Sequence, residues 1–433
     1  MDRWNRKRKT SPDDTFRRSA ASVLPGFLLA AALVLVLSGC GAKKNWIMFR
    51  GEQGRGATST TIRPPLGVKW NLKLQEHQEP AYAFNNPVVL DDTIYFGSTD
   101  GNVYALDIES GYMRWVHKTR GAINSVPVAD EDTLYIGSND GVLYALDQET
   151  GSSRWTFQAT STLQSTIIKH EDSILFVGDG DFVYSVDHET GELQYRLPNL
   201  VWYYFTFQVY DDVIYFAPGP PERPHSMGAW DIESRSYLWV LDTVYLDAVW
   251  YSFPAIEGDT LYFSTMDPYA DVWELDYYAY DRLTGELEWK YSDLSVWPYT
   301  QEIDTIDLYE KYMRLLDYLA PSLWRNLVIY TSGDAVVRAL DRKSGRLVWE
   351  KQFETVTTSA PTVAGDYVYF GLDGSDNPYF PIPPKLICLS ARTGKQMWEM
   401  DLRGRLLSAP VVAQDWMIFG TDANRFYVLE ELF

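Results

Sequence analysis

Short runs of alternating apolar and polar residues follow one another along most of the chain, and turn-forming residues separate them. One stretch shows the order clearly, with apolar runs at 87–89, 93–97, 102–106 and 114–117. These runs are rich in β-branched and aromatic residues, and Gly, Asp and Ser lie between them, which is typical of strands joined by tight turns. The pattern predicts a unit of four short β-strands.

The same unit recurs along the chain in a constant internal register. Its marker begins with a small residue, usually followed by Asp two positions later and then Gly, and it ends on an aromatic residue ten positions after the first. The marker occurs seven times, starting at Ala105, Ala145, Ser185, Ala229, Ala279, Ala339 and Cys388 and ending at Trp115, Trp155, Tyr195, Trp239, Trp289, Trp349 and Trp398. Tandem four-stranded units of about forty residues predict a β-propeller.

An eighth unit is divided between two distant parts of the sequence. Residues 409–412, 416–420 and 426–429 supply three strands, and 67–74 supplies a strand that has no unit of its own. Together they would complete one blade and close a ring, which protects strand edges. We therefore expect an all-β, eight-bladed β-propeller of four-stranded blades over 67–433, with the last blade closed by an N-terminal strand, after a lead-in at 40–66.

The repeated Asp, Gly and aromatic residues are expected to build the fold. The carboxylate can accept backbone N–H bonds in the turn, Gly can adopt a positive φ, and the aromatic ring can cover the junction between blades. A motif that recurs in every unit cannot mark a single site. This structural role is assigned to Asp107, Gly111, Trp115, Asp147, Gly151, Trp155, Asp281, Gly285, Trp289, Asp341, Gly345, Trp349 and Trp398.

The marker resembles that of the bacterial quinoprotein-like (PQQ-like) repeat family, whose blades carry Ala-x-Asp-x-x-Thr-Gly-x-x-x-Trp. The residues Trp46, Phe49, Arg50 and Gly51 are also similar to the Trp-x-x-Phe-Arg-Gly opening of many such propellers. In the dehydrogenases of this family, the resemblance implies a quinone cofactor, calcium and an adjacent cysteine pair. That pair is absent from the sequence, so we do not expect PQQ as a cofactor. Calcium is not expected either, because the candidate ligands Asp267, Asp271, Glu274 and Asp276 do not have the spacing of a calcium-binding loop.

The first 39 residues have the composition of a lipoprotein signal. Basic residues cluster between 3 and 18, an apolar run covers 23–37, and small residues precede Cys40. The run is short for a membrane-spanning helix, and its end resembles the lipobox of bacterial lipoproteins. We expect 1–39 to be a signal peptide cleaved before Cys40, lipidation of Cys40, and a buried structural role for Cys388.

Departures from the repeat gather on one face of the expected propeller. Loops between the second and third strands of a blade lie on the same face as the connections between blades. The loops between the second and third strands are longer at 217–227, 266–277 and 372–384. A short amphipathic helix is predicted near 303–319, after a blade connection. Three successive blade connections are rich in aromatic residues, and the candidate partner or ligand residues on them are Trp202, Tyr203, Tyr204, Trp250, Tyr251, Trp297 and Tyr299.

We call this surface the loop face, and we expect any binding site for a partner or ligand to lie on it. Trp and Tyr give large contact areas with few rotatable bonds, which suits protein recognition, and they also stack on sugar rings. Packing of the inserted loops is the structural alternative. The five histidines are dispersed along the sequence, and no catalytic or metal-binding residue is assigned.

These features predict a non-enzymatic, lipid-anchored scaffold that binds a protein partner in the cell envelope. In plan it resembles the propeller lipoproteins of the outer-membrane β-barrel assembly machinery, and Gly41 after the lipidation site favours the outer membrane, with the propeller in the periplasm. The formal net charge of −21 at pH 7 argues against a nucleic-acid partner. A small-ligand or glycan-binding propeller stays open as an alternative, and a quinone-dependent dehydrogenase is the least favoured function.

Overall fold

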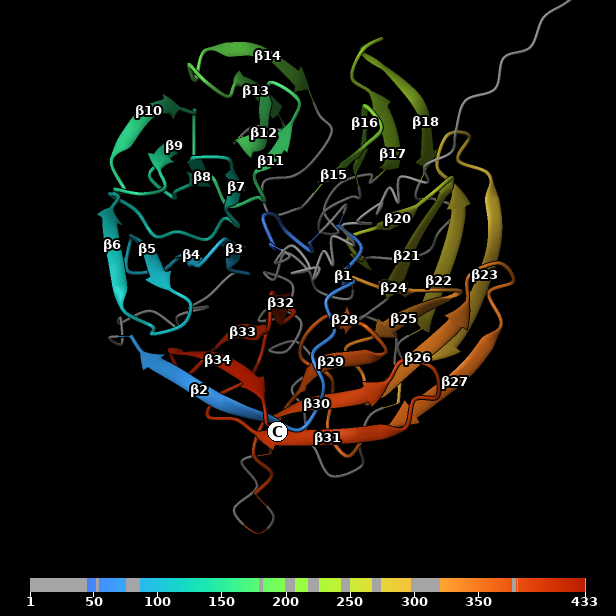
Figure 1. Ribbon diagram of the computed structural model, residues 1–433. Coiled ribbons are helices and arrows are strands. Elements are labelled where there is room, and N and C mark those ends of the chain that lie inside the picture. Colours follow the sequence, from blue (N-terminus) through green and yellow to red (C-terminus); the bar gives the residue numbers. More distant parts are fainter. Residues whose placement is uncertain are drawn as a thin grey trace, which may run out of the picture. The chain divides into compact units, whose positions relative to one another are not determined.

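Antiparallel sheets repeat around a common axis within the unit Lys43–Phe433 (Figure 1). The computed structural model describes residues 45–51, 54–74, 86–178, 182–198, 207–216, 226–242, 250–266, 274–296, 320–375, 379 and 381–432. Within these ranges the regular elements are all β-strands, and they form eight sheets. The expected all-β, eight-bladed β-propeller is confirmed.

The first four blades each consist of four strands in consecutive order. Blade 1 contains β3 (Val88–Leu90), β4 (Thr93–Gly97), β5 (Asn102–Asp107) and β6 (Met113–Lys118). Blade 2 contains β7 (Val128–Asp130), β8 (Thr133–Gly137), β9 (Val142–Asp147) and β10 (Ser153–Gln158). Blade 3 contains β11 (Ile168–His170), β12 (Ser173–Gly178), β13 (Phe182–Asp187) and β14 (Leu193–Pro198), and blade 4 contains β15 (Phe207–Tyr210), β16 (Val213–Phe216), β17 (Ser226–Asp231) and β18 (Ser236–Asp242).

Among the other four blades, blade 5 has a fifth strand, and blades 7 and 8 each include a strand from near the start of the chain. Blade 5 contains β19 (Trp250–Tyr251), β20 (Ala255–Glu257), β21 (Thr260–Met266), β22 (Glu274–Asp281) and β23 (Leu287–Leu294). Blade 6 contains β24 (Ser322–Trp324), β25 (Leu327–Thr331), β26 (Val336–Asp341) and β27 (Leu347–Gln352). Blade 7 adds β1 (Ala57–Thr58) to β28 (Thr362–Ala364), β29 (Tyr367–Leu372), β30 (Lys385–Ser390) and β31 (Gln396–Asp401), and blade 8 joins β2 (Leu66–Lys73) to β32 (Val411–Ala413), β33 (Trp416–Thr421) and β34 (Arg425–Glu431).

Burial changes from the middle of a blade to its outer edge. Every residue of β4 is buried, because each face of this strand packs against a neighbouring blade. In the outermost strand β6, Trp115 is the buried residue and the others are exposed or half-buried. The strands therefore place the core between blades, and the outer edges face solvent.

The ring closes through β2, as the sequence predicts. This strand pairs antiparallel with β34, from Leu66 opposite Glu431 to Lys73 opposite Arg425. In Figure 1, β2 lies at the outer edge of the sheet that contains β34, β33 and β32. Because β2 precedes blade 1 in the chain and completes blade 8, closure joins residues more than 350 positions apart.

Neighbouring blades are joined by the repeated aromatic and Gly residues. The Nε1 of Trp115 in blade 1 donates to the carbonyl of Gln148 in blade 2 at 2.8 Å. A Cβ on Gly151 would lie 2.6 Å from the Trp115 ring, so the ring packs where only Gly leaves room. The same contact pairs Trp70 with Gly111, Trp155 with Gly191, Trp239 with Gly285, Trp289 with Gly345 and Trp349 with Gly394.

Blade 5 differs from the sequence-based expectation. Strand β21 continues through Met266, and β22 begins at Glu274, so the connection predicted at 266–277 is shorter than expected because its ends pair as strands. Trp250 and Tyr251, expected in a blade connection, form β19 and pair with Met266 and Thr265. The predicted helix near 303–319 lies outside the described residues.

Candidate functional site

The aromatic residues proposed for the loop face are described only in blade 5. Trp250 and Tyr251 lie on β19, beside the end of β21 that leads into the connection between the second and third strands. The other candidates, and the proposed lipidation site, lie outside the described residues: Trp202, Tyr203, Tyr204, Trp297, Tyr299 and Cys40. The structure therefore places β19 on the loop face and leaves the remaining candidates as predictions.

The short connections of the loop face share an Asp–Tyr hydrogen bond. The hydroxyl of Tyr104 donates to Asp100 at 2.5 Å in blade 1, and that of Tyr144 donates to Asp140 at 2.8 Å in blade 2. Burial, followed by the bond to Asp100, raises the pKa of Tyr104 to about 12. Each tyrosine thus stays a neutral donor that fixes its loop.

Blade 6 replaces this Tyr with Arg338, at the same position of the repeat. Its Nη1 and Nη2 donate to the two carboxylate oxygens of Asp334 at 3.1 and 3.0 Å, and its Nε donates to Asp293 at 2.8 Å. The side chains of Arg338 and Asp334 are almost completely buried. The backbone N–H of Val296 also donates to Asp334 at 2.9 Å. This network holds the end of blade 5 against the loop of blade 6, directly before residues 297–319.

The lead-in has a structural role that the sequence did not reveal. Trp46 forms a bridge with Val89 of the innermost strand of blade 1, and Phe49 packs in a buried cluster with residues of several blades: Val126, Phe253, Ala320, Ala360 and Ala409. The rings of Phe49 and Phe253 meet edge to face, with centroids 5.0 Å apart. Figure 1 shows the blue lead-in crossing the middle of the ring. The lead-in therefore fills the axis of the propeller.

Arg50 fixes the lead-in inside the ring. Its Nη1 donates to the carbonyl of Pro361 at 3.1 Å, and its Nη2 donates to the carbonyl of Pro321 at 2.6 Å and to the Ser322 hydroxyl at 3.0 Å. These acceptors belong to blades 6 and 7. Gly56 has φ +63°, and a Cβ there would collide with the Arg50 guanidinium. We call residues 46–50, which lie at the axis, the plug, and the Arg-Gly motif at its end is a sequence signal that could have indicated it.

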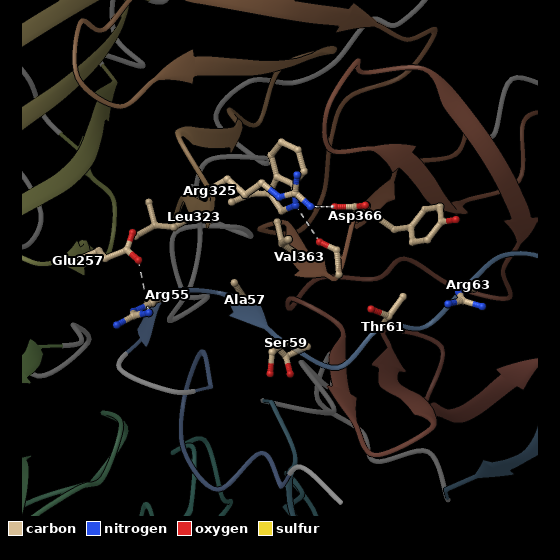
Figure 2. Close-up of a pocket in the computed structure, with 14 residues that line it drawn as sticks. Arg55, Ala57, Ser59, Thr61, Arg63, Glu257, Leu323, Arg325, Val363 and Asp366 are labelled. Atoms are coloured by element: carbon tan, nitrogen blue, oxygen red, sulfur yellow. Dashed lines mark hydrogen bonds and ion pairs between the residues drawn. The ribbon is translucent and has the colours of Figure 1, made fainter. Parts of the chain in front are cut away.

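A pocket of about 640 Å³ opens on the opposite surface, which we call the turn face because it carries the turns after the first and third strands of each blade. The lead-in forms one side of it, from Arg55 to Arg63 (Figure 2). The other side is formed by the first turns of blades 5, 6 and 7, which contribute Glu257, Arg325 and Asp366. Four segments far apart in sequence thus meet there.

Charged pairs and one indole organise this pocket. Arg55 lies 3.6 Å from Glu257, and Nη2 of Arg325 lies 3.0 Å from Oδ1 of Asp366. The Arg325 guanidinium lies 4.7 Å from the centre of the Trp324 ring. Trp324 in turn donates from Nε1 to the carbonyl of Gly365 at 2.8 Å. The arrangement can bind a charged group.

A second group of titratable residues lies on the turn face at blades 3 and 4. His170, Glu171 and Asp212 place one potential metal ligand each within 4.8 Å of one another. Nε2 of His170 lies 2.8 Å from Oδ1 of Asp212, and both acidic residues are exposed. The hydrogen bond between His170 and Asp212 explains why these side chains lie close together.

No helix in the described part of the chain is long and apolar enough to cross a membrane.

A family model described as outer membrane protein assembly factor BamB matches residues 67–193 and 328–432, more than half of the chain. The chain belongs to the BamB family. The matched ranges cover blades 1 and 2 and most of blades 3, 6, 7 and 8, in which the repeat is most regular. No curated protein sequence matches the chain.

Solved structures of BamB and of quinoproteins share the fold. BamB from Moraxella catarrhalis has a TM-score of 0.59 and 16% identity, with 85% of this chain and 98% of that chain covered. A europium-containing methanol dehydrogenase has a TM-score of 0.64 and 14% identity, covering 89% and 98%. The quinohemoprotein alcohol dehydrogenase ADHIIG from Pseudomonas putida HK5 has a TM-score of 0.63 and 16% identity, covering 89% and 80%. At these identities, the likeness concerns the fold alone.

Proposed function

We propose that this BamB-family protein is a non-enzymatic scaffold, lipid-anchored at Cys40 to the outer membrane, whose loop face binds a protein of the β-barrel assembly machinery in the periplasm. Membership of the family supports a protein-binding role in outer membrane assembly. The contrast between the two faces supports the choice of surface. The longer connections belong to the loop face, whereas the turn face carries the short repeated turns.

The observation that carries the proposal is the extension of blade 5. Strands β21 and β22 continue in register to Met266 and Leu275, and β19 pairs along the projecting part of β21. A strand-supported projection is a firmer platform for aromatic contacts than an isolated loop, because its backbone is already ordered before a partner binds. Trp250 lies on this projection.

The test is photo-crosslinking in living cells with the full-length protein. A photoreactive residue replaces Trp250, and a matched probe replaces Tyr112, which is 78% exposed beside a turn of blade 1. A discrete adduct to a barrel-assembly protein from position 250, together with none from position 112, supports the proposal. Equal adducts from both positions, or none from position 250 in cells that produce the folded protein, would contradict it.

We also propose that the protein works without a quinone cofactor. Support comes from the propeller axis, where Phe49 and Arg50 occupy the space between the innermost strands of several blades. The single described cysteine, Cys388, is buried in blade 7. Spectroscopic titration with PQQ and calcium checks this proposal. Saturable binding accompanied by dye-linked alcohol oxidation would overturn it.

A further inference from the structure

The turn-face pocket differs from the rest of the molecule in its charge. Arg55, Arg63 and Arg325 line it against two acidic residues, Glu257 and Asp366. The chain as a whole has a formal net charge of −21. A local excess of arginine in an acidic protein concentrates positive potential in a concave site, where field lines are focused. The pocket is therefore suited to an anion.

The two acidic residues form only weak ion pairs with Arg55 and Arg325. Glu257 lies 3.6 Å from Arg55 and also pairs with Arg342, so one carboxylate is shared by two guanidinium groups. The side chains of Arg325 and Asp366 are 58% and 56% exposed. Exposed ion pairs of this kind contribute about 1 kcal/mol or less, so another anion can compete with them.

Two arginines offer donors toward a ligand. Arg63 is exposed, and its guanidinium has no hydrogen-bond or ion-pair partner among the residues that the structure describes; its backbone amide donates to Glu431. Arg325 stacks on Trp324, which restrains the guanidinium, and only its Nη2 binds Asp366. A guanidinium has five N–H donors in a planar fork that matches carboxylate and phosphate oxygens.

We propose that this pocket binds a small anionic ligand that carries phosphate or carboxylate groups. Arg63 and Arg325 donate to the anion, and the hydroxyl of Thr61 donates to a further oxygen. Leu323 and Val363 supply the apolar part of the lining. The volume of about 640 Å³ lies within the range of small-molecule sites. This site lies on the face opposite the proposed partner surface and does not depend on a protein partner.

Calorimetric titration of the purified protein with inorganic pyrophosphate, and separately with citrate, at low ionic strength tests the proposal. We expect one saturable site whose affinity falls about tenfold in R63Q and in R325Q, because each loses a charge-assisted hydrogen bond. The matched control is R120Q, an exposed arginine on the loop face, which should bind as the unaltered protein does. Absence of saturable binding for both probes, or equal weakening in R120Q, would overturn the proposal.

A vesicle experiment distinguishes a lipid headgroup from a soluble anion as the source of the charge. The protein, with Cys40 replaced by Ser, is sedimented with phosphatidylglycerol or phosphatidylcholine vesicles. The site with a lipid headgroup as its ligand is supported if the protein sediments with phosphatidylglycerol vesicles and if this sedimentation is lost both on addition of pyrophosphate and in the R325Q variant. Pyrophosphate binding without sedimentation supports the site with a soluble ligand. Sedimentation that R63Q and R325Q leave unchanged, without pyrophosphate binding, would overturn the site.

Discussion

The guanidinium of Arg235 lies 5.1 Å from the centre of the Tyr195 ring, at the junction between blades 3 and 4. At the equivalent point of six other junctions, a Trp ring packs against Gly, as Trp115 packs against Gly151. At this junction Tyr195 stands in place of the Trp and Arg235 in place of the Gly. Arg235 keeps the left-handed backbone conformation of that Gly, with φ 54°. The smaller ring and the longer side chain thus replace the usual contact with a cation–π contact.

This junction predicts a non-additive pair of substitutions. Tyr195→Trp alone should destabilise the protein by about 1 kcal/mol, because the larger ring meets the Arg235 side chain. Arg235→Gly alone should be nearly neutral, since relief of the left-handed backbone offsets the lost cation–π contact. The double substitution restores the contact of the other junctions and should stabilise by about 1 kcal/mol. Urea denaturation of all four proteins measures the coupling, and strict additivity would contradict the prediction.

Because Arg338 and Asp334 form a buried ion pair, we expect the stability of the protein to depend strongly on the residue at position 338. Arg338→Leu leaves Asp334 as an unpaired buried carboxylate, and we expect a loss of about 3–5 kcal/mol in the free energy of unfolding. Arg338→Tyr recreates the Tyr–Asp hydrogen bond of blades 1 and 2, so it should recover about 2 kcal/mol of that loss. Chemical denaturation measures both variants. Equal losses would show that Tyr cannot take the position of Arg338.

Arg50 is expected to hold the lead-in within the axis. Arg50→Ala removes the donors to the Pro321 and Pro361 carbonyls and leaves a cavity, so the free energy of unfolding should fall by about 2–4 kcal/mol. Limited proteolysis should then cut the lead-in while the blades resist. The matched control is Arg63→Ala, whose side chain is exposed. A lead-in that is equally resistant in both variants would contradict this role.

The repeated turns predict a loss of stability in acid. Hydrogen bonds from Ser110 and then Arg114 lower the pKa of Asp107 to about 2, and those from Arg154 and then Thr150 do the same for Asp147, against an ordinary value of 3.8. Since the folded pKa lies below the unfolded one, this stabilisation is complete above about pH 4 and is lost as the pH falls toward 2. We expect each Asp to contribute about 1–2 kcal/mol to the free energy of unfolding above pH 4, because solvent screens part of the interaction.

Urea denaturation between about pH 5 and pH 2.5 measures this dependence. The double variant Asp107→Asn/Asp147→Asn should be less stable at pH 5 and should lose less stability on acidification, because it has two fewer carboxylates to protonate. An identical pH slope for the variant and the unaltered protein would assign the acid sensitivity to other groups.

Cys388 should be unreactive in the folded protein. Its side chain is fully buried, and burial raises the pKa of its thiol to about 12, so the thiolate that reacts with alkylating agents is scarce at pH 8. We expect no alkylation of the Cys388 peptide by iodoacetamide until urea unfolds the protein, with mass spectrometry as the readout. Rapid labelling under native conditions would show that blade 7 opens locally.

The regular blades could be predicted from the sequence because their interactions are local. A turn Asp such as Asp107 bonds to a residue three positions away, and the strands that it joins are neighbours in the chain. The period of the repeat then fixed the number of blades and indicated that Leu66–Lys73 would complete the last one. The family model matches the part of the chain in which these repeats are regular.

The plug and the pocket required the tertiary structure. Arg50 bonds to residues about 270 and 311 positions away, and no periodic pattern encodes such a pair. The pocket likewise brings Arg55, Glu257, Arg325 and Asp366 together from four segments. The sequence alone determined the regular blades, because most of their strand pairs are neighbours in the chain. The tertiary structure decided how the lead-in occupies the axis and where the arginine pocket lies, because both depend on how the lead-in crosses the closed ring.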